Sequence, residues 1–220
     1  MEIKILYEDS FIIVCVKPAG IVSESGGMPE ILSKQLGTDR IYCVHRLDRG
    51  TSGIMLYAKD EKPAGACSRL FAEGLFAKHY CAVVCGYPES SSGTLEDFLY
   101  HDRIKNKTYV VNRIRKGVKP AKLSFRIIGT AVEPKISLLD ISLETGRSHQ
   151  IRAQFSSRGL PLFGDRKYGG ATSQGGIALI SRSAEFPHPI TGEPLRFSIP
   201  LPDTEPWSLI NYITEDTIWP

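Results

Sequence analysis

The most unusual stretch of the chain is His45-Arg46-Leu47-Asp48-Arg49-Gly50-Thr51-Ser52-Gly53. It combines an acid with two arginines, a histidine and two glycines, directly before the apolar run at residues 53–58. A core strand does not need these charges, whereas a loop that presents an acid among cations does. A turn in which Asp48 accepts hydrogen bonds from nearby backbone N–H groups would also explain the stretch. By itself, the stretch indicates a loop that leads into a strand, with or without chemistry.

Hydrophobic patterns outward from this loop predict several strands. A continuous apolar run at residues 11–16 ends at Lys17-Pro18-Ala19-Gly20, which is typical of a buried strand followed by a turn. The other predicted strands are apolar runs or regular alternations at residues 53–58, 80–85, 121–128 and 139–143.

Two helices are predicted. One covers residues 63–77, with Pro63 near its start. The other is short, with Ser148 as its N-cap and Gly159 as its C′ glycine. After Leu160 the abundance of Gly and Pro predicts mostly loops and short strands. Because strands outnumber helices and do not alternate regularly with them, the pattern favours an α+β fold.

Composition limits the class of protein. The chain has 220 residues, 42% hydrophobic and 23% charged, which suits one domain or a tight pair of subdomains and excludes disorder of the whole chain. The charged first ten residues do not resemble a signal peptide, and no apolar stretch approaches the roughly 20 residues of a membrane span. Five cysteines without a C-x-x-C pair indicate a reduced, cytoplasmic protein.

Charge distribution is more informative than the net charge of +3. Residues 101–130 contain nine Lys or Arg and a single acid, Asp102, which suits contact with phosphates. A solvated hairpin face is the alternative explanation. The scattered histidines and cysteines do not predict a metal site, and no glycine-rich nucleotide-binding motif is present.

Residues 45–53 resemble the H-R-L-D-x-x-T-S-G signature of RluA-type pseudouridine synthases, with every specified position present. Four further segments resemble motifs of the same family in the same order. They are the opening Tyr7-Glu8-Asp9 with its strand and turn, Lys78–Gly86, Thr145–Arg152, and Pro161–Gly169. His188–Glu193 resembles a C-terminal turn of these enzymes. The resemblance spans about residues 5 to 200, and ordered matches are far more specific than any single motif.

The resemblance implies roles for individual residues. Asp48 matches the catalytic aspartate, Tyr80 the tyrosine that stacks on the target base, and Arg152 the arginine paired with that aspartate. Arg46 matches an arginine that fills the space of a flipped base, and Ile151 matches an apolar position near the site. A uridine in a paired stem must be flipped out at a cost of a few kcal/mol, which an inserted cation and a stacking ring can offset.

Other implications concern partners and fold. Arg147, Lys167 and the basic stretch are expected to contact RNA backbone, although solvated charges are nearly as good an explanation for all of them. The resemblance implies a pseudouridine synthase catalytic fold, a long mixed, mostly antiparallel sheet flanked by helices and loops. It also implies a single catalytic domain over residues 1–220, without the S4-type RNA-binding domain that the family often carries. We expect a monomer that needs no cofactor or metal.

The function implied is the isomerisation of specific uridines in structured RNA, either tRNA or rRNA. Two alternatives have to be weighed. A catalytically silent RNA-binding protein on the same fold is disfavoured, because Asp48, Tyr80 and Arg152 are all intact. A hydrolase with Asp48 as its base would need a metal set or a second acid at suitable spacing, and the sequence offers neither.

Overall fold

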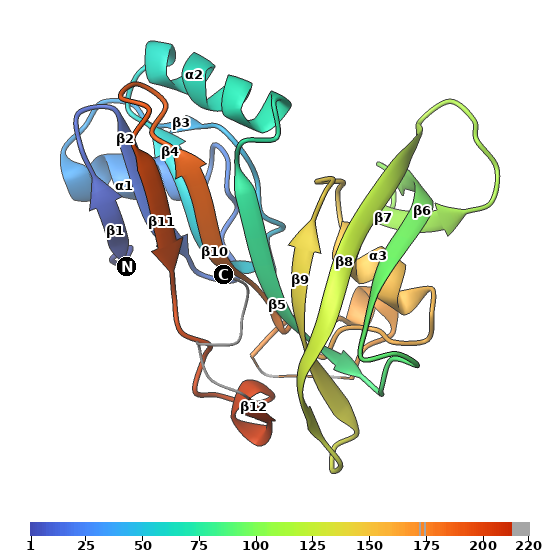
Figure 1. Ribbon diagram of the computed structural model, residues 1–220. Coiled ribbons are helices and arrows are strands. Elements are labelled where there is room, and N and C mark those ends of the chain that lie inside the picture. Colours follow the sequence, from blue (N-terminus) through green and yellow to red (C-terminus); the bar gives the residue numbers. More distant parts are fainter. Residues whose placement is uncertain (172, 174, 213–220) are drawn as a thin grey trace. The chain divides into compact units, whose positions relative to one another are not determined.

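The computed structural model describes residues 1–171, 173 and 175–212, which form two compact units (Figure 1). The first unit contains residues 1–79 and 180–200. Of the described residues, the second contains 80–171, 173, 175–179 and 201–212. The chain therefore passes from the first unit to the second inside strand β5 (Ala77–Cys85) and returns inside strand β10 (Leu179–Pro187).

The first unit is built on the strand order β1-β2-β4-β10. Its strands are β1 (Ile5–Glu8), β2 (Ile12–Lys17), β3 (Tyr42–Cys43), β4 (Ser52–Ala58), β10 and β11 (Pro194–Ser198). Strand β3 pairs with β4 and β11 with β10, both antiparallel, whereas β4 and β10 are parallel. The apolar runs of β2 and β4 are buried over nearly their whole length, which confirms the strands predicted at 11–16 and 53–58.

Two helices belong to the first unit, α1 (Met28–Leu36) and α2 (Glu61–Ala72). Helix α2 ends at Ala72, so the prediction of a helix to residue 77 was wrong at its C-terminal end. The reason is a glycine stop. Gly74 has φ +71°, its N–H donates to Phe71 O, and the N–H of Leu75 donates to Leu70 O. This pair of bonds is a Schellman motif, which closes a helix.

The second unit has the strand order β5-β9-β8-β6-β7, with the short β12 (Asn211–Tyr212) paired to β8. Its long strands are β6 (Ser92–Asp102), β8 (Val118–Ala131) and β9 (Ile136–Leu143), and β7 (Lys107–Val111) is shorter. Strands β6 and β8 run side by side over most of their length (Figure 1). Helix α3 (Gln150–Ser156) packs against β6 and β7, and two 3₁₀ turns follow at Arg166–Tyr168 and Trp207–Leu209.

Two details of the second unit correct the predictions. Helix α3 has His149 rather than Ser148 as its N-cap, and its C-cap is Ser157, so Gly159 lies one position beyond C′. The region after Leu160 was expected to hold mostly loops and short strands, yet β10 has nine residues. The α+β class and the mixed, mostly antiparallel strand pairing are confirmed, while the single domain over residues 1–220 stays a prediction.

Candidate active site

The signature loop at residues 45–53 joins β3 to β4, and hydrogen bonds from Ser23 to the backbone of Leu47 hold it in place. The Ser23 hydroxyl donates to Leu47 O at 2.8 Å and accepts from the Leu47 N–H at 3.0 Å. Leu47 itself is buried. One residue further on, the Thr51 N–H donates to Asp48 O at 2.9 Å and closes a turn. Asp48 therefore lies in a turn, directly after the buried residue Leu47.

The side chain of Lys17 contacts the same loop at Arg49. Its ammonium group is buried and donates to Ile21 O at 2.8 Å and Pro18 O at 3.0 Å, with Arg49 O at 3.4 Å. Burial lowers the pKa of Lys17 to about 8, and the negative charge of Asp48 acts in the opposite direction. The Lys-Pro-Ala-Gly turn thus has a physical role, because it places a buried cation beside the loop that carries Asp48.

Gly53, the last residue of the signature, allows two strands to meet. Its φ is +119°, and a Cβ there would lie 2.3 Å from Ser181 O. Ser181 is the residue of β10 that pairs with Gly53 in the parallel register. Only glycine satisfies both the backbone angle and the close approach, so the final residue of the signature is set by packing.

His45, the first residue of the signature, is held as a neutral ring. Its Nε2 accepts from the Leu56 N–H at 3.0 Å, and its Nδ1 lies 3.3 Å from Nζ of Lys78. Phe71 and Phe76 flank both groups. Burial, and then the neighbouring Lys78, lower the pKa of His45 well below its usual range, and burial lowers the pKa of Lys78 to about 8. His45 therefore anchors the loop rather than titrating near neutral pH.

Arg46 extends from the loop into solvent. Its guanidinium is 2.8 Å from the carboxylate of Glu24, and the two side chains are 70% and 46% exposed. A pair this exposed contributes little to stability. Arg46 is thus accessible to an approaching anion, at the small cost of leaving Glu24.

In the second unit, Arg152 forms a buried, two-pronged ion pair with Asp165. Nε and Nη2 donate to the two carboxylate oxygens at 2.7 and 2.9 Å. The side chains are only 6% and 1% exposed. Without the family resemblance, an exposed helix arginine would have been expected at this position. Two parallel hydrogen bonds fix the plane of the guanidinium.

The aromatic ring of Tyr168 packs against the guanidinium of Arg152. The guanidinium carbon of Arg152 lies 4.9 Å from the centre of the Tyr168 ring. The Tyr168 hydroxyl accepts from the Thr108 N–H at 2.7 Å and lies 3.0 Å from Nδ1 of His149. His149 has φ +53°, an unusual backbone conformation for a residue other than glycine. Tyr168 thus joins strand β7, the first turn of α3 and Arg152.

The remaining predicted residues also lie in the second unit. Tyr80 is buried in β5, and Ile151 is buried in the first turn of α3. Nε of Arg147 donates to Pro120 O at 3.0 Å, and Nζ of Lys167 donates to Asn106 O at 3.0 Å. Among the predicted catalytic residues, Asp48 belongs to the first unit, and Tyr80 and Arg152 belong to the second. The pairing of Arg152 with Asp48 stays a prediction.

Sequence reasoning assigned no role to Lys17, Asp165 or Tyr168. All three stand inside segments that resemble family motifs, and that was the available signal. What the sequence could not give is the partner of each residue.

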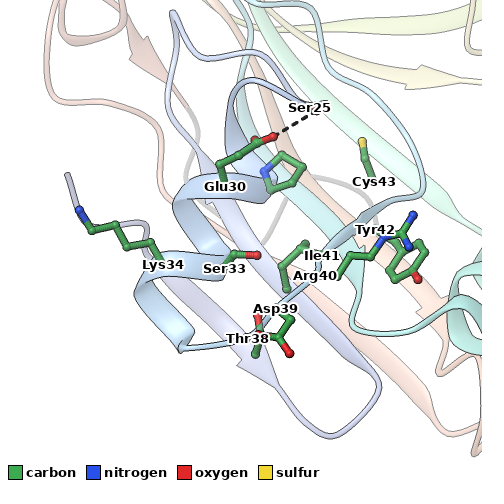
Figure 2. A pocket seen from close by; sticks show the side chains of 11 residues that line it. Ser25, Glu30, Ser33, Lys34, Thr38, Asp39, Arg40, Ile41, Tyr42 and Cys43 are labelled. Carbon is green, nitrogen blue, oxygen red and sulfur yellow. Dashed lines mark hydrogen bonds between the residues drawn. The ribbon is translucent and has the colours of Figure 1, made fainter.

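A separate pocket of about 780 Å³ lies in the first unit between α1 and β3 (Figure 2). Figure 2 shows cationic and acidic side chains mixed along its wall, among them Lys34, Arg40, Glu30 and Asp39. Cys43 also lines it, but burial raises the pKa of this thiol to about 11. The thiol is therefore protonated at neutral pH, and the pocket offers no activated nucleophile.

Residues 1–171, 173 and 175–212 contain no cluster of three or more His, Cys, Asp or Glu side chains that could hold a metal ion. Within the same residues, no helix is both long enough and apolar enough to span a bilayer.

Comparison with known proteins identifies the class. A family model described as RNA pseudouridylate synthase matches residues 11–157. An uncharacterized RNA pseudouridine synthase of Chlorobaculum parvum is 34% identical over 92% of this chain and 72% of its own length. The ribosomal large subunit pseudouridine synthase D of Xanthomonas campestris is 32% identical over 92% of this chain and 67% of its own length.

A solved structure supports the same fold. Human RNA Pseudouridylate Synthase Domain Containing 1 has a TM-score of 0.78 and 22% identity, covering 97% of this chain and 91% of that one. The chain belongs to the RNA pseudouridylate synthase family, and within it to the RluA-like enzymes. It is an RNA pseudouridine synthase, an isomerase.

Proposed function

We propose that this enzyme converts uridine to pseudouridine in structured RNA with Asp48 as its essential catalytic residue. The observation that carries the proposal is the way the signature loop is held. Ser23, Lys17 and Gly53 fix it at three points. A loop built in this way presents a carboxylate with little freedom, which is what positioned chemistry requires.

The reaction needs no redox partner. The bond between N1 of uracil and C1′ of ribose breaks, the base rotates, and a bond forms between C5 and C1′. The proton on C5 is released, and N1 gains one from solvent. A single carboxylate and a route for one proton are therefore sufficient, so we expect no cofactor.

Tyr80 and Arg152 are proposed as the other catalytic residues, on the basis of their positions in the matched motifs. The fixed plane of the Arg152 guanidinium, paired with Asp165 and stacked on Tyr168, suits a counter-ion for a second carboxylate. From the matched motifs we infer that Asp48 is this second carboxylate.

The proposed RNA contacts begin with Arg46, which would leave Glu24 and fill the space of the flipped uridine. Arg147, Lys167 and the basic stretch are proposed to contact phosphates, and Ile151 to form an apolar wall near the base. The substrate is proposed to be rRNA or tRNA. The names of relatives that act on the ribosomal large subunit make rRNA the first to test.

We further infer one catalytic domain, acting as a monomer in the cytoplasm. The family match at residues 11–157 covers parts of both units. The five cysteines, all within the described residues, form no disulfide, in keeping with a reducing compartment.

Tritium release from RNA labelled at uridine C5 tests the proposal. Wild type should release tritium from rRNA or tRNA while the RNA stays uncut, and Asp48→Ala should release none although it still folds and binds RNA. Near-normal release by Asp48→Ala would remove Asp48 from the mechanism. Binding without any release by wild type would favour a silent RNA-binding protein, and cut RNA would favour a hydrolase.

A further inference from the structure

Strands β6 and β7 carry an aromatic face that is turned away from helix α3. Tyr100 lies directly opposite Tyr109, and Phe98 directly opposite Val111. Directly opposed residues share one face of a sheet, and sequence neighbours point to the other. The neighbours Leu99 and Thr108 are buried. We name the set Phe98, Tyr100, Tyr109 and Val111 the outer face.

The outer face is open to solvent despite its apolar character. Phe98 is 37% exposed and Tyr109 is 36% exposed. Strand β8 extends the same face, because Val118 pairs with Tyr100 and Pro120 pairs with Phe98. Contiguous exposed apolar surface, unlike a single exposed side chain, marks interaction sites.

Cations border these rings. The guanidinium carbon of Arg115 lies 4.8 Å from the centre of the Tyr100 ring, and Nζ of Lys107 lies 5.7 Å from that of Tyr109. The turn between β6 and β7 adds Arg103 and Lys105. Its acid, Asp102, is already engaged by the N–H groups of Ile104 and Lys105, both at 3.0 Å. The outer face therefore combines aromatic rings with positive charge.

We propose that the outer face binds single-stranded or looped RNA. Bases stack on Tyr109 and Phe98, and Arg115 and Lys107 contact the adjacent phosphates. Aromatic rings that accept base stacking, set among cations, suit single-stranded nucleic acid. Charge argues against a second copy of the chain, because two such faces would bring like charges together. The proposal rests on the proposed function, since it takes RNA as the substrate, and it adds where the RNA outside the active site is held.

Fluorescence anisotropy with labelled oligouridine tests the outer face directly. Tyr109→Ala and Phe98→Ala should each weaken binding by about 5- to 150-fold, the range for loss of one base stack. Tyr87→Ala is the matched control, because Tyr87 is also in the second unit, is 39% exposed and has Nζ of Lys135 4.8 Å from its ring centre. The control should bind as wild type does.

Salt dependence separates stacking from charge. Tyr109→Ala should leave the slope of log K against log salt unchanged, whereas Lys107→Gln should reduce it by about 0.7. Tyr109→Leu, which keeps an apolar side chain in the strand, should bind as weakly as Tyr109→Ala, so that loss of the ring rather than misfolding is measured. Circular dichroism of each variant checks the fold.

Three outcomes would overturn the inference. Wild-type affinity of both folded alanine variants would remove the outer face from RNA binding. Equal weakening by Tyr87→Ala would make the effect nonspecific. A change of oligomeric state in Tyr109→Ala without weaker RNA binding would assign the face to contact between copies. Tritium release by wild type, measured separately, shows whether the proposed function itself holds.

Discussion

Replacing Asp165 by Asn should destabilise the protein strongly, because it breaks a buried ion pair and keeps the shape of the side chain. Asp165 accepts two hydrogen bonds from Arg152, at 2.7 and 2.9 Å, with both side chains almost fully buried. Removing one partner of such a pair costs about 3–5 kcal/mol, because the other charge stays buried after its partner is lost. In a chain of this length each kcal/mol lowers Tm by about 2–4 °C. The expected loss is therefore about 6–20 °C.

Thermal unfolding followed by circular dichroism measures this loss, with Glu185→Gln as the control. Glu185 pairs with Arg196 at 2.9 Å, but those side chains are 51% and 68% exposed. An exposed pair is worth about 0–1 kcal/mol, so the control should lose at most a few degrees. If Asp165→Asn and Glu185→Gln melted together, the burial of the Arg152 pair would not have the energetic weight assigned to it here.

Three further changes test other parts of the structure. Gly53→Ala should abolish soluble, folded protein, because the new Cβ would lie 2.3 Å from Ser181 O; a normally folded variant would contradict the close approach. Tyr168→Phe leaves the buried Thr108 N–H without its acceptor and should cost about 1–3 kcal/mol in urea unfolding, with Tyr87→Phe as an exposed control that costs less. Lys78 has a folded-state pKa of about 8 against an ordinary 10.5, so the unfolded chain binds more protons between these values. The free energy of unfolding of wild type should therefore rise relative to Lys78→Met from about pH 8 to 10.5, and parallel pH curves would refute the burial of this amine.

The strands next to the signature loop could be predicted because their sequences leave little choice. Residues 12–17 and 52–58 are apolar over nearly their whole length and are buried as strands β2 and β4. The helix before β5 was correctly expected but extended too far, because Gly74 was not taken as a stop. Helix α1 was missed although Pro29 lies at its start and Gly37, with φ +65°, at its end. Those signals are local, and a reading that weights apolar runs first overlooks them.

The candidate site shows a different limit. A motif indicates that Arg152 and Asp165 matter, but their pairing depends on how α3 lies against the 3₁₀ turn at Arg166–Tyr168, and that is a tertiary contact. The same holds for Lys17, whose three carbonyl partners come from two separate loops. Strand β10 was missed in part for a related reason, since its first residues pair with β4, far away in the sequence, although its second half pairs with the nearby β11.

The discontinuity of the first unit has a consequence for biosynthesis. Its sheet needs β10, yet residues 80–179 must leave the ribosome before β10 does. During that interval Ser52 and Gly53 of β4 lack their partners in β10, while β3 covers only Tyr57 and Ala58, and such a partly open edge invites pairing with other chains. A nascent chain halted near residue 179 should therefore depend on chaperones, and release should end that dependence once β10 has emerged.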